Sequence, residues 1–220
     1  MSTFVLVHGA GDGGWSWHVV AAELRRRGHD VVTPDLPADD DSVGLDGYAD
    51  TVVEAVGDRS DLVVVGHSFG AFTAPLAAAR LAADLLVLVA GMVPLPGERP
   101  DDWWEATGHQ SSTEYVDDDA LYYHDVPAEL AARARRRERN HPSTAAGAAP
   151  WPLPSWPDIP TKFIVCTEDR LFPADFLRRV VADRLAITPD ELPAGHYAAL
   201  ARPVELAALL DGYVATHSTC

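Results

Sequence analysis

The chain has 220 residues, of which 47% are hydrophobic, and a formal net charge of −16 at pH 7. That length suits one well-filled domain rather than two. The negative charge argues against nucleic acid and anionic membranes as partners, since both attract basic surfaces. No apolar run is long enough to span a membrane, and the first residues lack the features of a signal peptide. We therefore expect a cytoplasmic protein, monomeric or homodimeric.

Short apolar runs alternate with helical segments along most of the chain. Such runs are typical of buried parallel strands. Strands are predicted at residues 4–7, 30–33, 62–65, 84–90, 162–166 and 186–192, and helices at 15–27, 46–56, between Ser68 and the fourth strand, 172–184 and 204–216. This alternation predicts an α/β fold with a mostly parallel central sheet and helices on both faces.

Residues 101–158 interrupt the alternation with a basic helical stretch at 128–139 and a proline-rich end. We interpret them as a cap insertion covering the sheet, with residues 1–100 and 159–220 forming the core of a single domain. The insertion contains the aromatic residues Trp103, Trp104, Tyr115, Tyr122, Tyr123, Trp151 and Trp156. These side chains either form the insertion's own core or line a ligand pocket, and we expect some to do both. The candidates for substrate binding are Trp103, Trp104, Tyr122 and Tyr123.

The sequence Gly-His-Ser-Phe-Gly at residues 66–70 directly follows the third predicted strand. Its two glycines allow a sharp, strained turn that presents the Oγ of Ser68 at the top of the sheet. The same turn places the N–H of Phe69 at a helix N-terminus, where it stabilises developing negative charge. The five-residue pattern alone arises by chance in glycine-rich chains. The strand before it and the helix after it indicate a nucleophile.

A serine hydroxyl needs a base, and we assign that role to His196, in the loop after the last predicted strand. The order serine, then acid, then histidine is the one expected when this turn carries the nucleophile. His67 projects elsewhere on the turn, and His8 is expected to make a structural hydrogen bond. Asp169, after the penultimate strand, is favoured over Glu168 as the carboxylate that orients the imidazole.

The loop after the first strand is rich in glycine between residues 8 and 14. Its bare backbone suits a second oxyanion donor, which we assign to the N–H of Ala10 beside that of Phe69. The dinucleotide-binding spacing, G-x-G-x-x-G, is also present at Gly9, Gly11 and Gly14. Asp35 lies about twenty residues further on, as that alternative requires. The alternative is weaker, because a dinucleotide-binding protein has no use for the serine turn or the late histidine.

Four segments together resemble the α/β-hydrolase superfamily, and within it the plant methylesterase and hydroxynitrile lyase group and its bacterial relatives. These segments are FVLVHGA with GGWSW, GHSFG, CTED and the late GH pair. The resemblance covers nearly the whole chain. It implies an α/β-hydrolase fold with a small helical cap, a Ser68–His196–Asp169 triad and an oxyanion hole at Ala10 and Phe69. The implied function is a serine hydrolase acting on a small carboxylic ester, without a metal or organic cofactor.

Two positions separate the branches of this group. The lyases carry a threonine where this chain has Gly9, and a lysine directly after the catalytic histidine, where this chain has Tyr197. Tyr197 offers no positive charge to stabilise a cyanide leaving group, so the esterase prediction leads. Gly9 and Tyr197 join the candidates for substrate binding. The alternatives left open are a cofactor-free lyase and a small-molecule receptor that retains the triad. The insertion is shorter than the plant cap, so plant-hormone methyl esters are not carried over as substrates.

Overall fold

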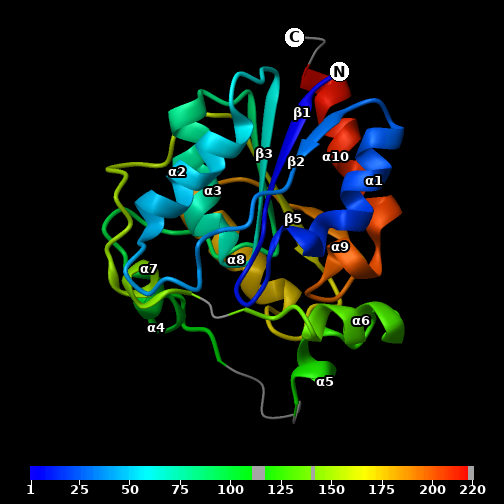
Figure 1. Cartoon of the computed structure of the whole chain (residues 1–220). Coiled ribbons are helices and arrows are strands. Elements are labelled where there is room, and N and C mark those ends of the chain that lie inside the picture. The colour runs from blue at the N-terminus through cyan, green and yellow to red at the C-terminus, as the bar shows by residue number, and fades with distance from the viewer. Residues whose placement is uncertain (111–116, 140–141, 218–220) are drawn as a thin grey trace.

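The computed structural model describes residues 1–110, 117–139 and 142–217 (Figure 1). Tyr115, His141 and Cys220 lie outside these residues. Within them, one sheet of six parallel strands has the order β2-β1-β3-β4-β5-β6. The strands are β1 (Thr3–Val7), β2 (Asp30–Val32), β3 (Leu62–His67), β4 (Leu85–Val89), β5 (Thr161–Cys166) and β6 (Asp190–Leu192). The predicted α/β fold is confirmed, and every strand pairing is parallel.

Helices cover both faces of this sheet. The pair α2 and α3 packs on one face, and the pair α1 and α10 packs on the opposite face (Figure 1). The helices of the α/β core are α1 (His18–Arg26), α2 (Leu45–Val56), α3 (Gly70–Leu81), α8 (Ala174–Leu185), α9 (Ala198–Ala201) and α10 (Pro203–His217). Because both faces are covered, the central strands β1, β3 and β4 are buried along their whole length. Among the described residues, no helix combines the length and the apolar character needed to cross a membrane.

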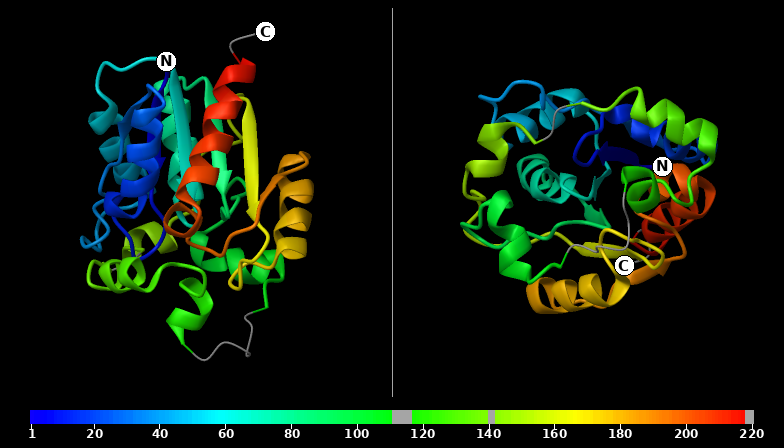
Figure 2. Two further views of the ribbon diagram at one scale, coloured as in Figure 1. Left: turned by 90° about the vertical axis from the view of Figure 1, so that its right-hand side faces the viewer. Right: turned by 90° about the horizontal axis from the view of Figure 1, so that it is seen from below.

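The predicted insertion contributes short helices at one end of the sheet. They are α4 (Trp103–Thr107), α5 (Asp118–Tyr122), α6 (Ala128–Arg135) and α7 (Thr144–Ala148). Seen from below, they are arranged around the carboxyl ends of the strands (Figure 2). In parallel sheets this is the edge where ligands bind. The division into core and cap at residues 101 and 158 stays a prediction.

Several predicted elements are shorter in the structure, and two of them have a clear physical cause. The last strand spans only Asp190–Leu192 rather than residues 186–192, because Ala186 ends α8 in a left-handed conformation (φ 54°) and Pro189 has no N–H for a ladder. The helix predicted at 128–139 ends at Arg135. Beyond it the chain turns, and the N–H of Arg139 donates to the main-chain oxygen of Gly11 at 2.9 Å. The end of this segment therefore binds the glycine-rich loop instead of continuing the helix.

Candidate active site

Ser68 lies on a strained turn between β3 and α3. Its φ is 51°, a left-handed conformation that is uncommon for a residue other than glycine. Main-chain hydrogen bonds hold it there: its N–H donates to Val89 at 3.1 Å, and its oxygen accepts from Met92 at 3.0 Å. Gly70 allows the close approach that the turn needs, because a Cβ there would lie 2.5 Å from the main-chain oxygen of His8. The sequence prediction of a sharp turn at this point is confirmed.

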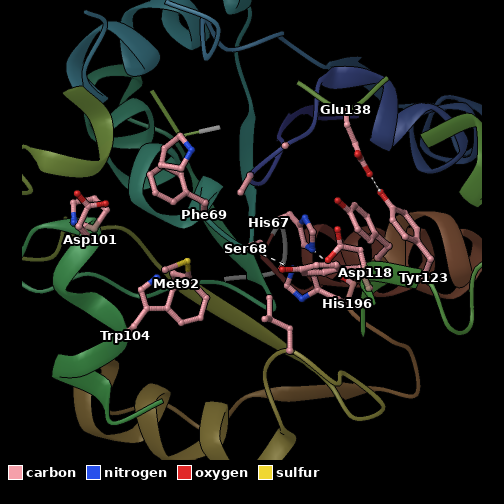
Figure 3. A pocket seen from close by; sticks show the side chains of 17 residues that line it. His67, Ser68, Phe69, Met92, Asp101, Trp104, Asp118, Tyr123, Glu138 and His196 are labelled. Atoms are coloured by element: carbon pink, nitrogen blue, oxygen red, sulfur yellow. Dashed lines mark hydrogen bonds between the residues drawn. The ribbon is translucent and has the colours of Figure 1, made fainter. Parts of the chain in front are cut away.

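A continuous hydrogen-bonded chain joins Ser68 to two side chains from distant loops (Figure 3). The Oγ of Ser68 lies 3.0 Å from Nε2 of His196, and Nδ1 of His196 lies 2.8 Å from Oδ2 of Asp169. The carboxylate oxygen accepts a hydrogen bond from the protonated Nδ1, which leaves Nε2 as the acceptor facing the hydroxyl group. All three residues are buried. The arrangement is that of a nucleophile, a base and an orienting acid.

The turn between β5 and α8 fixes the position of Asp169. Its Oδ1 accepts the N–H groups of Leu171 at 2.9 Å and Phe172 at 3.0 Å, while Oδ2 faces His196. Glu168 lies elsewhere, and its main-chain oxygen accepts from the His124 ring at 3.0 Å. The structure thus places Asp169, rather than its competitor, beside the imidazole.

Two further histidines lie close by, and both are buried neutral rings. Burial lowers the pKa of His67 to about 3, with a smaller contribution from the charge of His196. Burial also lowers the pKa of His8 to about 4. The Nε2 of His8 accepts the N–H of Leu36 at 3.0 Å, which is the structural role predicted for it. His67 donates to the main-chain oxygen of His196 at 2.9 Å, a contact that the sequence did not suggest.

The segment between α5 and α6 contacts the loops that carry His196 and Asp169. The Oδ2 of Asp125 accepts the N–H of Gly195 at 2.7 Å, directly before His196. The His124 ring hydrogen-bonds the main-chain oxygen of Glu168, the residue directly before Asp169. Neither residue stood out in the sequence, because no local pattern encodes contacts made over 70 and 44 positions.

A cavity of about 380 Å³ opens over Ser68. Figure 3 shows Phe69, Met92 and Trp104 on one side of it, and His196 and Tyr123 on the other. Of the predicted substrate-binding residues, Trp104, Tyr122, Tyr123 and Tyr197 line this cavity, as do the predicted oxyanion residues Ala10 and Phe69. Most of its wall is aromatic or apolar, as is usual for a small-molecule site.

Trp103 and Gly9 do not line the cavity, which corrects the prediction for both. Trp103 is fully buried in the core, where its Nε1 donates to the main-chain oxygen of Val93 at 3.0 Å. The two neighbouring tryptophans point different ways because successive helical residues face different directions. Gly9 lies behind the nucleophile, and a Cβ there would lie 3.0 Å from the Cβ of Ser68.

The glycine-rich loop does not present a free phosphate site at its helical end. The N–H of Gly14 donates to Oδ1 of Asp35 at 2.7 Å, so a carboxylate occupies the place that a pyrophosphate takes in dinucleotide-binding proteins. This geometry disfavours the dinucleotide alternative. Among the described residues, no group of three or more His, Cys, Asp or Glu side chains is placed to hold a metal ion.

A parallel sheet with a nucleophile turn after β3, and with an acid and a base after β5 and β6, defines an α/β protein of the hydrolase type. The family model described as "Alpha/beta hydrolase family" matches residues 4–209, and the chain belongs to that family.

Relatives narrow the class within the family. Methylesterase 7 of Arabidopsis thaliana is 27% identical over 246 residues, covering 94% of each chain. The carbendazim hydrolyzing esterase of Nocardioides sp. (strain SG-4G) is 35% identical over 109 residues, which cover 44% of this chain and 45% of that protein. The crystal structure of polyneuridine aldehyde esterase has the same fold, with a TM-score of 0.81 and 21% identity over 97% of this chain and 99% of the other. These matches confirm the predicted resemblance and the prediction of an esterase-type α/β hydrolase.

Proposed function

We propose that this protein is a serine esterase that cleaves a small carboxylic ester through an acyl-enzyme. The observation that carries the proposal is the hydrogen-bonded chain from Ser68 through His196 to Asp169, at 3.0 Å and 2.8 Å, at the base of a cavity. A buried hydroxyl within hydrogen-bond reach of an oriented imidazole is the geometry that nucleophilic catalysis needs.

In the first half-reaction, Nε2 of His196 takes the proton of Ser68 while Oγ attacks the ester carbonyl carbon. The carbonyl π electrons move to the oxygen, which becomes an oxyanion. When the tetrahedral intermediate collapses, the C–O bond to the alcohol breaks and His196 returns the proton to the leaving alkoxide. Water then attacks the acyl-enzyme by the same route and releases the acid. Asp169 keeps Nδ1 protonated throughout and stabilises the transient imidazolium.

The proposed oxyanion donors are the main-chain N–H groups of Ala10 and Phe69. Both residues line the cavity beside Ser68. Phe69 directly precedes α3, so the partial positive charge of that helix terminus adds to its N–H. Ala10 follows Gly9, which approaches Ser68 closely from the other side.

Tyr197 favours an esterase over a lyase of the hydroxynitrile type. It follows the base and lines the cavity. Burial, together with the nearby charge of Asp12, raises its pKa well above the ordinary value of 10, so the phenol is neutral. A neutral phenol gives a departing cyanide no positive charge.

Mass spectrometry after incubation with a serine-directed phosphonate tests the nucleophile. We expect one adduct on the wild-type protein and on Ser60→Ala, an exposed control serine, and none on Ser68→Ala. An equal adduct on Ser68→Ala would refute the assignment. A panel of chromogenic esters, including methyl esters, then separates the esterase from a receptor. The esterase should turn them over, and Ser68→Ala should lower kcat by a factor on the order of 10⁴ or more.

A further inference from the structure

Charged side chains line the cavity unevenly. Asp101, Asp118 and Glu138 are exposed residues among those that line it, and the described lining residues include no lysine or arginine. Asp169, deeper in the site, is already paired with His196. The open part of the cavity is therefore bordered by negative charge alone.

The nearby arginines have partners of their own, and one of these partners belongs to the cavity wall: the guanidinium group of Arg135 lies over the Tyr123 ring, 5.8 Å from its centroid. Arg135 pairs with Asp119, and Arg139 pairs with Asp39 at 2.5 Å. The guanidinium group of Arg137 lies over the Trp15 ring, 4.6 Å from its centroid. None of these contacts neutralises Asp118 or Glu138, and no ion pair within the described part of the chain does so.

Two of the three carboxylates lie beside tyrosine rings. Asp118 precedes Tyr122 by one turn of α5, and its charge adds to burial in raising the pKa of the Tyr122 phenol. The hydroxyl group of Tyr123 lies 3.4 Å from Oε1 of Glu138. Figure 3 shows Asp118, Tyr123 and Glu138 on the same side of the cavity as His196.

The opposite side differs in character. Phe69, Met92 and Trp104 lie there. Asp101 is the carboxylate on that side, beside Trp104 in the close-up. The cavity thus has a mostly apolar half, with Asp101 as its carboxylate, and a half that combines tyrosine rings with two carboxylates. Ser68 lies between the two halves.

Aromatic faces next to carboxylates are the surroundings that stabilise an organic ammonium ion. The ring quadrupole attracts the cation, and the carboxylates add a Coulomb attraction that needs no fixed geometry. A substrate carboxylate at the same place would be repelled. The net charge of −16 extends the same preference to the approach of the substrate.

The Tyr123 ring is stacked on Tyr197 at 4.7 Å and contacts Arg135, which leaves the Tyr122 ring for a ligand. We propose that the substrates of this site are esters that carry a positively charged ammonium group, held against Tyr122 between Asp118 and Glu138. The apolar half then receives the uncharged part of the molecule. This inference rests on the proposed esterase function and adds a substrate class to it.

Two thioesters of nearly the same shape test the proposal. Acetylthiocholine carries a trimethylammonium group, and S-(3,3-dimethylbutyl) thioacetate carries a neutral tert-butyl group in its place. At low ionic strength we expect kcat/KM to be at least about fivefold higher for the cation, as one or two screened charge contacts and a cation–π contact provide. The preference should shrink in 0.5 M salt, because the carboxylates are exposed.

Substitutions show whether these carboxylates cause the preference. The double variant Asp118→Asn/Glu138→Gln should bring the ratio of the two kcat/KM values close to one, because it removes the attraction for the cationic thioester alone. Asp58 is an exposed residue between α2 and β3, at the amino end of that strand and so at the end of the sheet opposite the cavity. Asp58→Asn removes one charge there and should leave the ratio unchanged. A wild-type ratio of one or less, or a ratio that persists in the double variant, would overturn the proposal.

Cleavage of the neutral thioester reports the esterase function independently of the charge preference. If neither thioester is cleaved, a binding measurement tests the ammonium site directly. Choline and 3,3-dimethylbutanol are then titrated into the protein, with the fluorescence of Trp104 and the other tryptophans as the signal. Tighter binding of choline that is lost in the double variant supports the ammonium site even where the esterase function fails. Equal binding of the two alcohols contradicts it.

Discussion

The Nε2 of His67, the residue before the nucleophile, lies 2.9 Å from the main-chain oxygen of His196. A carbonyl oxygen only accepts hydrogen bonds, so Nε2 carries the proton and donates it. Burial lowers the pKa of His67 to about 3, and the ring therefore keeps this neutral form across the working range of an esterase. One buried hydrogen bond thus joins the turn that carries Ser68 to the loop that carries its base.

Removing this bond should lower kcat more than it changes KM. His67→Phe retains a ring but has no donor, so we expect kcat to fall about tenfold, the effect of losing one buried hydrogen bond of about 1 to 1.5 kcal/mol. His67→Gln retains an N–H donor and should recover part of the loss. Steady-state kinetics on one chromogenic ester measures both. Equal losses in the two variants would show that the imidazole acts through packing instead.

Asp169→Asn separates the catalytic and structural roles of this side chain. The amide oxygen still accepts from Leu171 and Phe172 in the turn before α8, so the free energy of unfolding should change little. The amide nitrogen faces Nδ1 of His196 and donates to it, which moves the imidazole proton to Nε2, the wrong position for a base. We expect kcat to fall by a factor on the order of 10³ to 10⁴. Urea unfolding and kcat, measured on the same preparation, check both statements, and a variant with near-normal kcat would contradict the assigned role.

Gly70→Ala tests the closeness of the nucleophile turn to β1. The added Cβ would meet the main-chain oxygens of His8 and Val7 at 2.5 Å and 2.9 Å, and neither atom moves without shifting the strand end. We expect a loss of about 1 to 3 kcal/mol in the free energy of unfolding and a lower kcat, because α3 and the N–H of Phe69 are displaced. Gly212→Ala is the matched control. It is exposed in α10 with nothing within 4 Å of the added atom, and it should stabilise the protein by up to about 1 kcal/mol. Similar effects from both substitutions would contradict the steric argument.

His8 makes the stability depend on pH in a predictable direction. Its pKa falls from an ordinary 6.5 to about 4 in the folded protein, so above pH 6.5 neither the folded nor the unfolded state binds the proton. As the pH falls below 6.5, only the unfolded state takes it up, and the free energy of unfolding decreases. Between pH 7 and pH 5 the contribution of His8 to this decrease should be about 2 kcal/mol.

His8→Gln removes that proton-binding group and should flatten the decrease by the same amount, whatever the substitution costs at pH 7. Urea unfolding at several pH values between 7 and 5 measures the slope. His67, whose pKa is about 3, contributes to the slope in the same direction and remains in the variant. Carboxylates such as Glu23, with a pKa lowered to about 2, affect stability only below this interval. Identical slopes for the two proteins would contradict the assignment.

Local sequence patterns were sufficient to predict where strands and turns follow one another along the chain. The apolar run before Gly66 predicted β3, and the two glycines predicted the strained turn at Ser68. The predicted ends of helices and strands differ from the structure where a contact with a distant segment competes with the local preference for helix or strand. The end of α6 is an example: the helix stops at Arg135, and the N–H of Arg139 donates to the main-chain oxygen of Gly11 instead of to a helical carbonyl.

The amino-acid sequence by itself determined the fold class and predicted the strained turn at Ser68, because strand periodicity and the glycines around Ser68 act over a few residues. It also limited the base to a late loop through chain order. Only the tertiary structure decided which carboxylate faces His196, that Trp104 rather than Trp103 reaches the cavity, and that Asp118 and Glu138 border it. Those outcomes depend on contacts between segments far apart in the chain. The direction of each side chain and the distance between charged groups are set by how these segments pack, and a local sequence pattern does not encode that packing.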